Sequence, residues 1–97
     1  RISGLFIDSS NDMLYAIDSE SDPNYNPGGW RKGLRVGSAR TGEVYYFVPE
    51  HVSERASGMG GYGSMGEGVT VDNQGNVYAG EVGPVQGMTK FVPRLVP

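Results

Sequence analysis

The feature that most constrains the fold is an internal repeat of one β-hairpin. The first copy joins Gly-Leu-Phe-Ile-Asp at residues 4–8 to Met-Leu-Tyr-Ala-Ile-Asp at residues 13–18 through a polar turn. The second joins Gly-Val-Thr-Val-Asp at residues 68–72 to Asn-Val-Tyr-Ala-Gly-Glu at residues 76–81, with a turn one residue shorter. Alternating β-forming residues on either side of a polar turn predict a β-hairpin. The Asp before each turn can accept backbone N–H groups within it, which gives it a structural role.

Three further strands are expected beside the two hairpins. Segments rich in β-forming residues predict strands at residues 34–38, 44–48 and 88–92, with a turn at residues 40–42. Pro93 and Pro97 argue against another central strand in the tail. No segment shows the apolar periodicity of a helix. The sequence therefore predicts an all-β fold with about seven strands in two antiparallel, blade-like sheets of the four-stranded type.

A four-stranded unit with a repeated hairpin is the organisation of a β-propeller blade. Blades usually take ~40–45 residues, and the repeat is longer here because two long connections, at residues 19–32 and 53–66, enlarge it. We assign residues 1–52 to a first blade, 53–66 to a Gly-rich connector and 67–97 to a second, incomplete blade.

Two blades do not close a ring, and they leave long unpaired edges that associate unless they are covered. Further blades are therefore expected, either from a longer polypeptide or from neighbouring copies that form a homo-oligomer or a filament. A strand supplied from elsewhere would complete the second blade.

Strand alternation also predicts which side chains are buried between the blades, because each strand turns one set of side chains toward the same face. The predicted core consists of Leu5, Ile7, Leu14, Ala16, Val36, Val69, Val71, Val77, Ala79 and Phe91.

Composition excludes several classes of function. The net charge of −3 provides no basic surface for nucleic acid. No apolar run approaches the ~20 residues of a membrane-spanning helix. With no cysteine, neither a disulfide framework nor a thiolate zinc site is available. The chain begins at Arg1 rather than Met, which is compatible with a removed leader, and we expect a secreted, extracellular or periplasmic location.

The second hairpin, Gly-Val-Thr-Val-Asp-Asn-Gln-Gly-Asn-Val-Tyr at residues 68–78, resembles an NHL-type repeat. It is also similar to propellers of the senescence-marker-protein/gluconolactonase class and of the peptidyl-hydroxyglycine amidating lyases. The first hairpin, at residues 3–22, resembles the same group. The resemblance implies a six-bladed propeller and does not select one activity, because a common fold hosts many functions.

The resemblance also implies candidate metal ligands. In gluconolactonase-like enzymes the residue before the repeat's Gly faces the axial channel, where an Asn and an Asp help to bind a divalent cation. The matching positions here are Ser3 and Glu67. Glu67 keeps a carboxylate suited to calcium, whereas Ser3 departs from the Asn of the family. Glu67 is either a metal or substrate ligand or a solvated channel residue. Amidating lyases use histidine zinc ligands, but His51 is the only histidine and reads as a surface residue.

A second possible calcium site lies at the end of the first hairpin. Asp18, Glu20 and Asp22 alternate like the opening of a calcium-binding loop. The sixth position is Pro23 rather than Gly and the twelfth is Gly29 rather than Glu, so a polar loop is the competing interpretation. No cofactor is predicted, and calcium is the candidate metal.

The long connections carry aromatic residues that either form contact surfaces or pack over blade edges. Tyr25, Trp30 and Tyr62 are these candidates. The Gly-rich stretch at residues 58–66 lacks the Gly-Lys-Ser/Thr ending of a phosphate-binding loop, and no Gly-x-Ser-x-Gly nucleophile motif occurs.

Two functional classes remain. The first is a non-catalytic propeller module that acts as a structural or interaction unit. The second is part of a divalent-metal-dependent lactonase-like hydrolase or amidating-lyase-like enzyme with its site at the axial channel. The Ser3 departure and the single His51 favour the first class, and Glu67 keeps the second open.

Overall fold

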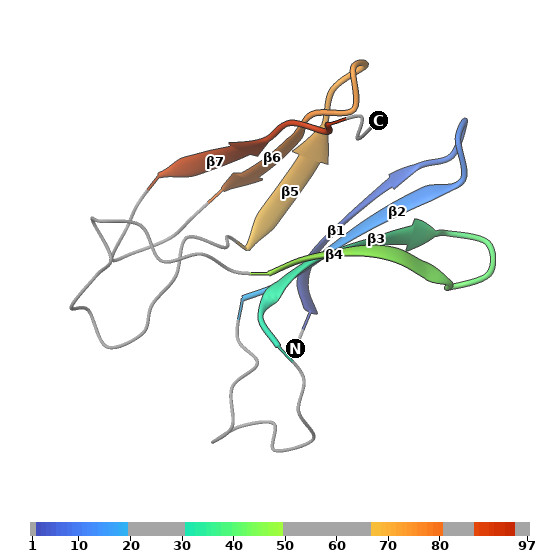
Figure 1. Cartoon of the computed structure of the whole chain (residues 1–97), viewed down its shortest axis with the longest axis horizontal. Helices are drawn as coiled ribbons and strands as arrows, with labels where there is room; N and C mark the ends of the chain where they lie inside the picture. The colour runs from blue at the N-terminus through green and yellow to red at the C-terminus, as the bar shows by residue number, and fades with distance from the viewer. Residues whose placement is uncertain (1, 20–30, 50–66, 81–86, 95–97) are drawn as a thin grey trace.

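The computed structural model of the chain describes residues 2–19, 31–49, 67–80 and 87–94. These residues form a four-stranded antiparallel sheet, in the order β1-β2-β3-β4, and a three-stranded one, in the order β5-β6-β7 (Figure 1). The strands are β1 (Ile2–Asp8), β2 (Met13–Asp18), β3 (Gly33–Ser38), β4 (Val44–Pro49), β5 (Gly68–Val71), β6 (Val77–Gly80) and β7 (Met88–Phe91). The described part of the chain holds no helix long and apolar enough to cross a membrane. The all-β prediction with two antiparallel sheets is confirmed.

The register of the two hairpins reproduces the sequence repeat. Phe6 lies opposite Tyr15 in the first hairpin, and Thr70 lies opposite Tyr78 in the second. Each turn also has one residue with positive φ near its end, Asp12 at 53° and Gly75 at 83°. Few side chains adopt this left-handed conformation easily, and Asp and Gly are among those that do. The repeat is therefore structural as well as sequential.

The core lies where the two sheets face each other. Ile17 and Leu34 from the four-stranded sheet and Ala79 from the three-stranded sheet are 0%, 1% and 0% exposed. Strand β5 lies against β1 and β2, and one apolar cluster runs across both sheets. Its members are Tyr15, Ile17, Leu34, Val36, Val77 and Ala79, with Phe6, Met13, Val48, Val69, Val71 and Phe91 packed around them.

The predicted core is correct for the three-stranded sheet and wrong for β1. Leu5 and Ile7 are 62% and 56% exposed, whereas Phe6 between them packs against the core. Successive side chains of a strand point to opposite faces, and β1 turns the face that holds Phe6 toward the second sheet. Leu14 belongs to the same face as Leu5 and Ile7 and is half-buried.

The two sheets approach most closely at Gly4. A Cβ atom on this residue would overlap the carbonyl oxygen of Glu67, the residue that precedes β5. Figure 1 shows the sheets close together near the start of β5 and further apart at the hairpin turns. The repeat's Gly is therefore needed in the first copy because the backbone of the next sheet takes the place of a side chain.

We predict that Gly4→Ala destabilises the chain by ~1–3 kcal/mol, because the added methyl group must displace backbone rather than a flexible side chain. Urea unfolding measures the change. Gly80→Ala is the matched control, because among the described residues no atom lies within 4 Å of the Cβ it would add. Equal stability of the two variants would show that the sheets do not meet at Gly4.

Candidate functional site

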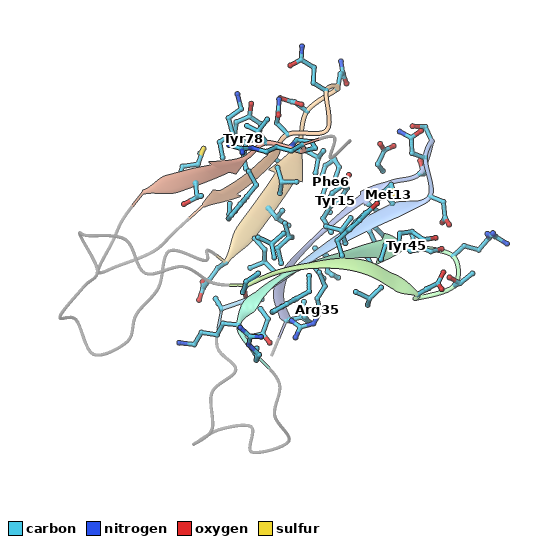
Figure 2. All side chains as sticks on the ribbon, viewed as in Figure 1. Phe6, Met13, Tyr15, Arg35, Tyr45 and Tyr78 are labelled. Atoms are coloured by element: carbon cyan, nitrogen blue, oxygen red, sulfur yellow. The ribbon has the colours of Figure 1, made fainter. Side chains whose placement is uncertain are left out.

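The four-stranded sheet has an apolar face that points away from the three-stranded sheet, here called the outer face. By strand alternation and register it carries Leu5, Ile7, Leu14, Ala16, Arg35 and Phe47. Figure 2 shows Arg35 on this far side of the sheet, whereas Phe6 and Tyr15 lie between the two sheets. Most of this face is aliphatic or aromatic. Adjacent exposed apolar side chains on one sheet face are typical of a contact surface.

The outer face corresponds, through the repeat, to a face that is buried elsewhere in the same chain. Leu5 and Ile7 are the counterparts of Val69 and Val71, and Leu14 and Ala16 are those of Val77 and Ala79. Those four counterparts point toward the four-stranded sheet and form the second sheet's part of the core. This strand face is thus packed against the other sheet in the second copy of the repeat, whereas in the first copy its Leu5 and Ile7 are exposed, Leu14 is half-buried and Ala16 is buried.

Arg35 forms the polar part of the outer face. Its guanidinium carbon lies 4.7 Å from the centre of the Phe47 ring, and its Nη1 atom lies 3.8 Å from Oδ2 of Asp18. Asp18 is only 1% exposed, so this contact gives a buried carboxylate a cationic neighbour. Arg35 also donates a hydrogen bond of 3.0 Å to the carbonyl of Arg31. These contacts hold Arg35 in place on β3.

The carboxylates that precede the two hairpin turns accept hydrogen bonds within their own hairpins. Asp8 accepts hydrogen bonds from the backbone N–H and hydroxyl of Ser10 and from the side-chain amide of Asn11. The side-chain bonds from Ser10 and then Asn11 lower the pKa of Asp8. This confirms the structural role that the sequence predicts for the repeat's Asp.

Asp72 has the denser set of donors. It accepts the backbone N–H groups of Gln74 and Asn76, the amide of Asn76 at 2.9 Å and the hydroxyl of Tyr78 at 2.9 Å. The side-chain bond from Asn76 contributes most to lowering the pKa of Asp72 from 3.8 to about 2. Hydrogen bonds to the charged form favour ionisation, so this carboxylate holds the turn together only while it is charged.

A cleft of about 490 Å³ separates the two turns. The Asp8 and Asp72 turns form its polar walls, and Phe6, Met13 and Tyr15 are among its apolar lining residues. Burial first, and then the charge of Asp8, raise the pKa of Tyr15. Among the described residues, no three His, Cys, Asp or Glu side chains gather as a metal site would require. The cleft therefore presents carboxylates that are already engaged.

Asp12 joins the turn of the first hairpin to the turn between β3 and β4. Its carboxylate accepts the Ser38 hydroxyl at 2.5 Å and the Arg40 backbone N–H at 2.8 Å. The hydrogen bond from Ser38 is the largest cause of the lowered pKa of Asp12. Sequence reasoning missed this residue, although its place at the end of a polar turn and its tolerance of positive φ were usable signals.

The structure places three of the residues selected from the sequence. The Ser3 hydroxyl donates to the Ile17 carbonyl at 3.3 Å and lies 2.9 Å from the Ser19 hydroxyl. Glu67 is exposed, and its backbone N–H donates to the Gly80 carbonyl at 2.9 Å. Asp18 lies beside Arg35 on the outer face. The other candidates, Glu20, Asp22, Tyr25, Trp30, His51 and Tyr62, lie outside the described residues, as does the 53–66 connector.

We predict that Asp72→Asn lowers the stability of the chain at neutral pH and removes part of its pH dependence. The folded-state pKa of about 2 lies below the ordinary 3.8, so the stabilisation is complete above about pH 5. It is lost as the pH falls from about 4 to about 2. Urea unfolding between pH 2 and pH 6 should therefore show a gap between the two proteins that closes on acidification.

Glu43→Gln is the control, because it removes one negative charge from an exposed residue. Its unfolding midpoint is expected to follow that of the unmodified chain. A gap between Asp72→Asn and the unmodified chain that stays constant from pH 2 to pH 6 would contradict a role for the charged carboxylate.

Comparison with known proteins returned no match: no protein-family model, curated protein or solved structure is similar to this chain. Its function must therefore be argued from its own residues.

Proposed function

We propose that the chain is a non-catalytic structural or interaction unit of a β-propeller type of assembly, completed by further blades or by neighbouring subunits. One observation carries the proposal. The exposed Leu5 and Ile7 occupy the repeat positions of Val69 and Val71, which pack onto a neighbouring sheet. In the second copy of the repeat, the corresponding face is packed against another sheet. The outer face is therefore expected to pack against a sheet as well.

The energetics favour covering this face. Burial of one aliphatic side chain the size of Leu or Ile contributes ~1.5–3 kcal/mol. Leu5 and Ile7 lie two residues apart on one face, with the half-buried Leu14 beside them, so one flat partner covers all three. Two sheets that pack face to face, about 10 Å apart, cover such a surface.

The metal-dependent enzyme class receives no specific support from the described residues. Asp8 and Asp72 accept hydrogen bonds within their own hairpins, and Asp18 is buried against Arg35. Glu67 is exposed and stands without a described cluster of acidic or histidine residues. An interaction unit needs no carboxylate as a metal ligand or catalytic group. This agrees with the hydrogen bonds and the Arg35 contact in which Asp8, Asp72 and Asp18 take part.

The test is a double substitution on the outer face, Leu5→Glu with Ile7→Lys, which leaves the net charge unchanged. We expect the variant to fold, because both side chains are largely exposed within one chain. Its self-association should weaken about a hundredfold, since losing the burial of two side chains costs ~3 kcal/mol and ~1.4 kcal/mol is tenfold. Sedimentation velocity over a concentration series measures the association.

The control variant, Ala39→Glu with Gln74→Lys, introduces the same two charges at exposed turn residues away from the outer face. Its association is expected to equal that of the unmodified chain. A chain that stays monomeric at every concentration, or an outer-face variant that associates as before, contradicts the proposal.

Calcium separates the two functional classes. We expect added calcium chloride to leave the thermal midpoint of the chain unchanged, because Asp8, Asp18 and Asp72 are already engaged by other groups of the chain. A ligand that binds only the folded state raises the midpoint. A midpoint that rises with calcium and not with magnesium would favour the metal-dependent class.

A further inference from the structure

We infer that the partner covering the outer face is a second copy of this chain, which contributes the opposite face of its three-stranded sheet. This second surface, called the β5–β7 face, carries Gly68, Thr70, Tyr78, Gly80, Met88 and Lys90. Figure 2 shows Tyr78 on the side of the three-stranded sheet that points away from the four-stranded one. The inference rests on the proposed function and names the partner that the function requires.

The interface within the chain supplies the geometry. There, Phe6, Tyr15 and Ile17 of the first sheet receive Val69, Val71, Val77 and Ala79 of the second. Through the repeat, Phe6, Tyr15 and Ile17 correspond to Thr70, Tyr78 and Gly80. The chain therefore exposes one copy of each half of its own internal interface. Pairing the outer face of one molecule with the β5–β7 face of another repeats a contact that the chain already makes.

Gly68 marks where the backbone of the partner should approach. Its counterpart Gly4 is in contact with the Glu67 backbone, whereas among the described residues nothing lies within 4 Å of the Cβ position of Gly68. The residue corresponding to Glu67 is Ser3. In the repeated contact, the backbone at Ser3 of the second copy occupies the space beside Gly68. The space beside the repeat's glycine is thus filled at Gly4 and open at Gly68.

The side-chain sizes on the two exposed faces are complementary. Leu5, Ile7 and Leu14 are each larger than the valines that they match in the internal interface. On the β5–β7 face the change is in the other direction, with Thr70 in place of Phe6 and Gly80 in place of Ile17. The outer face thus has larger side chains, and the β5–β7 face has smaller ones, than their counterparts in the internal interface. The total packed volume therefore stays close to that of the internal interface. Met88, 69% exposed, adds a flexible apolar side chain.

Such a contact joins two different surfaces and is therefore heterologous. After pairing, one molecule keeps a free outer face and the other keeps a free β5–β7 face, so the association continues until it closes into a ring or grows as a filament. An isologous dimer, with two outer faces packed together, would instead stop at two molecules. This difference makes the inference testable separately from the proposed function.

The experiment mixes two variants that each lose one face. Leu5→Glu with Ile7→Lys removes the outer face, and Gly68→Val places a branched side chain where the partner's backbone should come. Each variant alone is expected to associate at least tenfold more weakly than the unmodified chain in sedimentation velocity. A mixture of the two should form a complex of one molecule of each and grow no further, because only one intact pair of faces remains.

Ala39→Val is the control, because Ala39 is an exposed turn residue outside both faces and receives the same branched side chain. This variant should associate as the unmodified chain does. Circular dichroism and thermal unfolding check that each variant is folded. If Gly68→Val associates normally while the outer-face variant does not, the inferred pairing of the outer face with the β5–β7 face is overturned and the proposed function stands. Normal association of the outer-face variant overturns both.

Discussion

The approach of one sheet's backbone to the other at Gly4 determines how the rest of the molecule is arranged. A side chain there would collide with the Glu67 carbonyl. Because Gly4 has none, the start of β5 can lie directly against β1. From that point the sheets diverge, with Ile17, Leu34 and Ala79 filling the narrow part. At the wide end the Asp8 and Asp72 turns stand apart and leave the cleft between them. Core, cleft and exposed faces all follow from this one close contact and the twist of the strands.

The strands were predictable because their boundaries are local. Asp and Gly residues mark the turns of the two hairpins. The strands expected at residues 34–38, 44–48 and 88–92 begin and end within one residue of β3, β4 and β7. The structural role of Asp72 was equally readable, because an Asp two residues before a backbone N–H forms its turn without help from the rest of the fold. Alternation also identified the buried face of β6.

The face of β1 was not predictable from alternation. Leu5, Phe6 and Ile7 are all apolar, so the period of two contains no information about which of them points inward. Only the position of the second sheet decides, and Phe6 is the one that it covers. The contact between Asp18 and Arg35 was not predictable for a related reason. The register pairs Asp18 with Gly33, and Arg35 lies two residues further along β3, so strand pairing, which sequence spacing does not express, brings the two side chains together.

Asp12 fixes the alignment of β2 with β3 from the end of the sheet opposite to the segment that connects these strands. Its bonds to Ser38 and Arg40 join residues 26 and 28 positions apart in the sequence. A register held at that end does not depend on how long the connecting segment is, and each doubling of the length of a connection costs only about 0.6 kcal/mol. The alignment of β2 with β3 should therefore survive insertions and deletions in the connection between them, provided that Ser19 and Arg31 keep their contacts with Ser3 and Arg35.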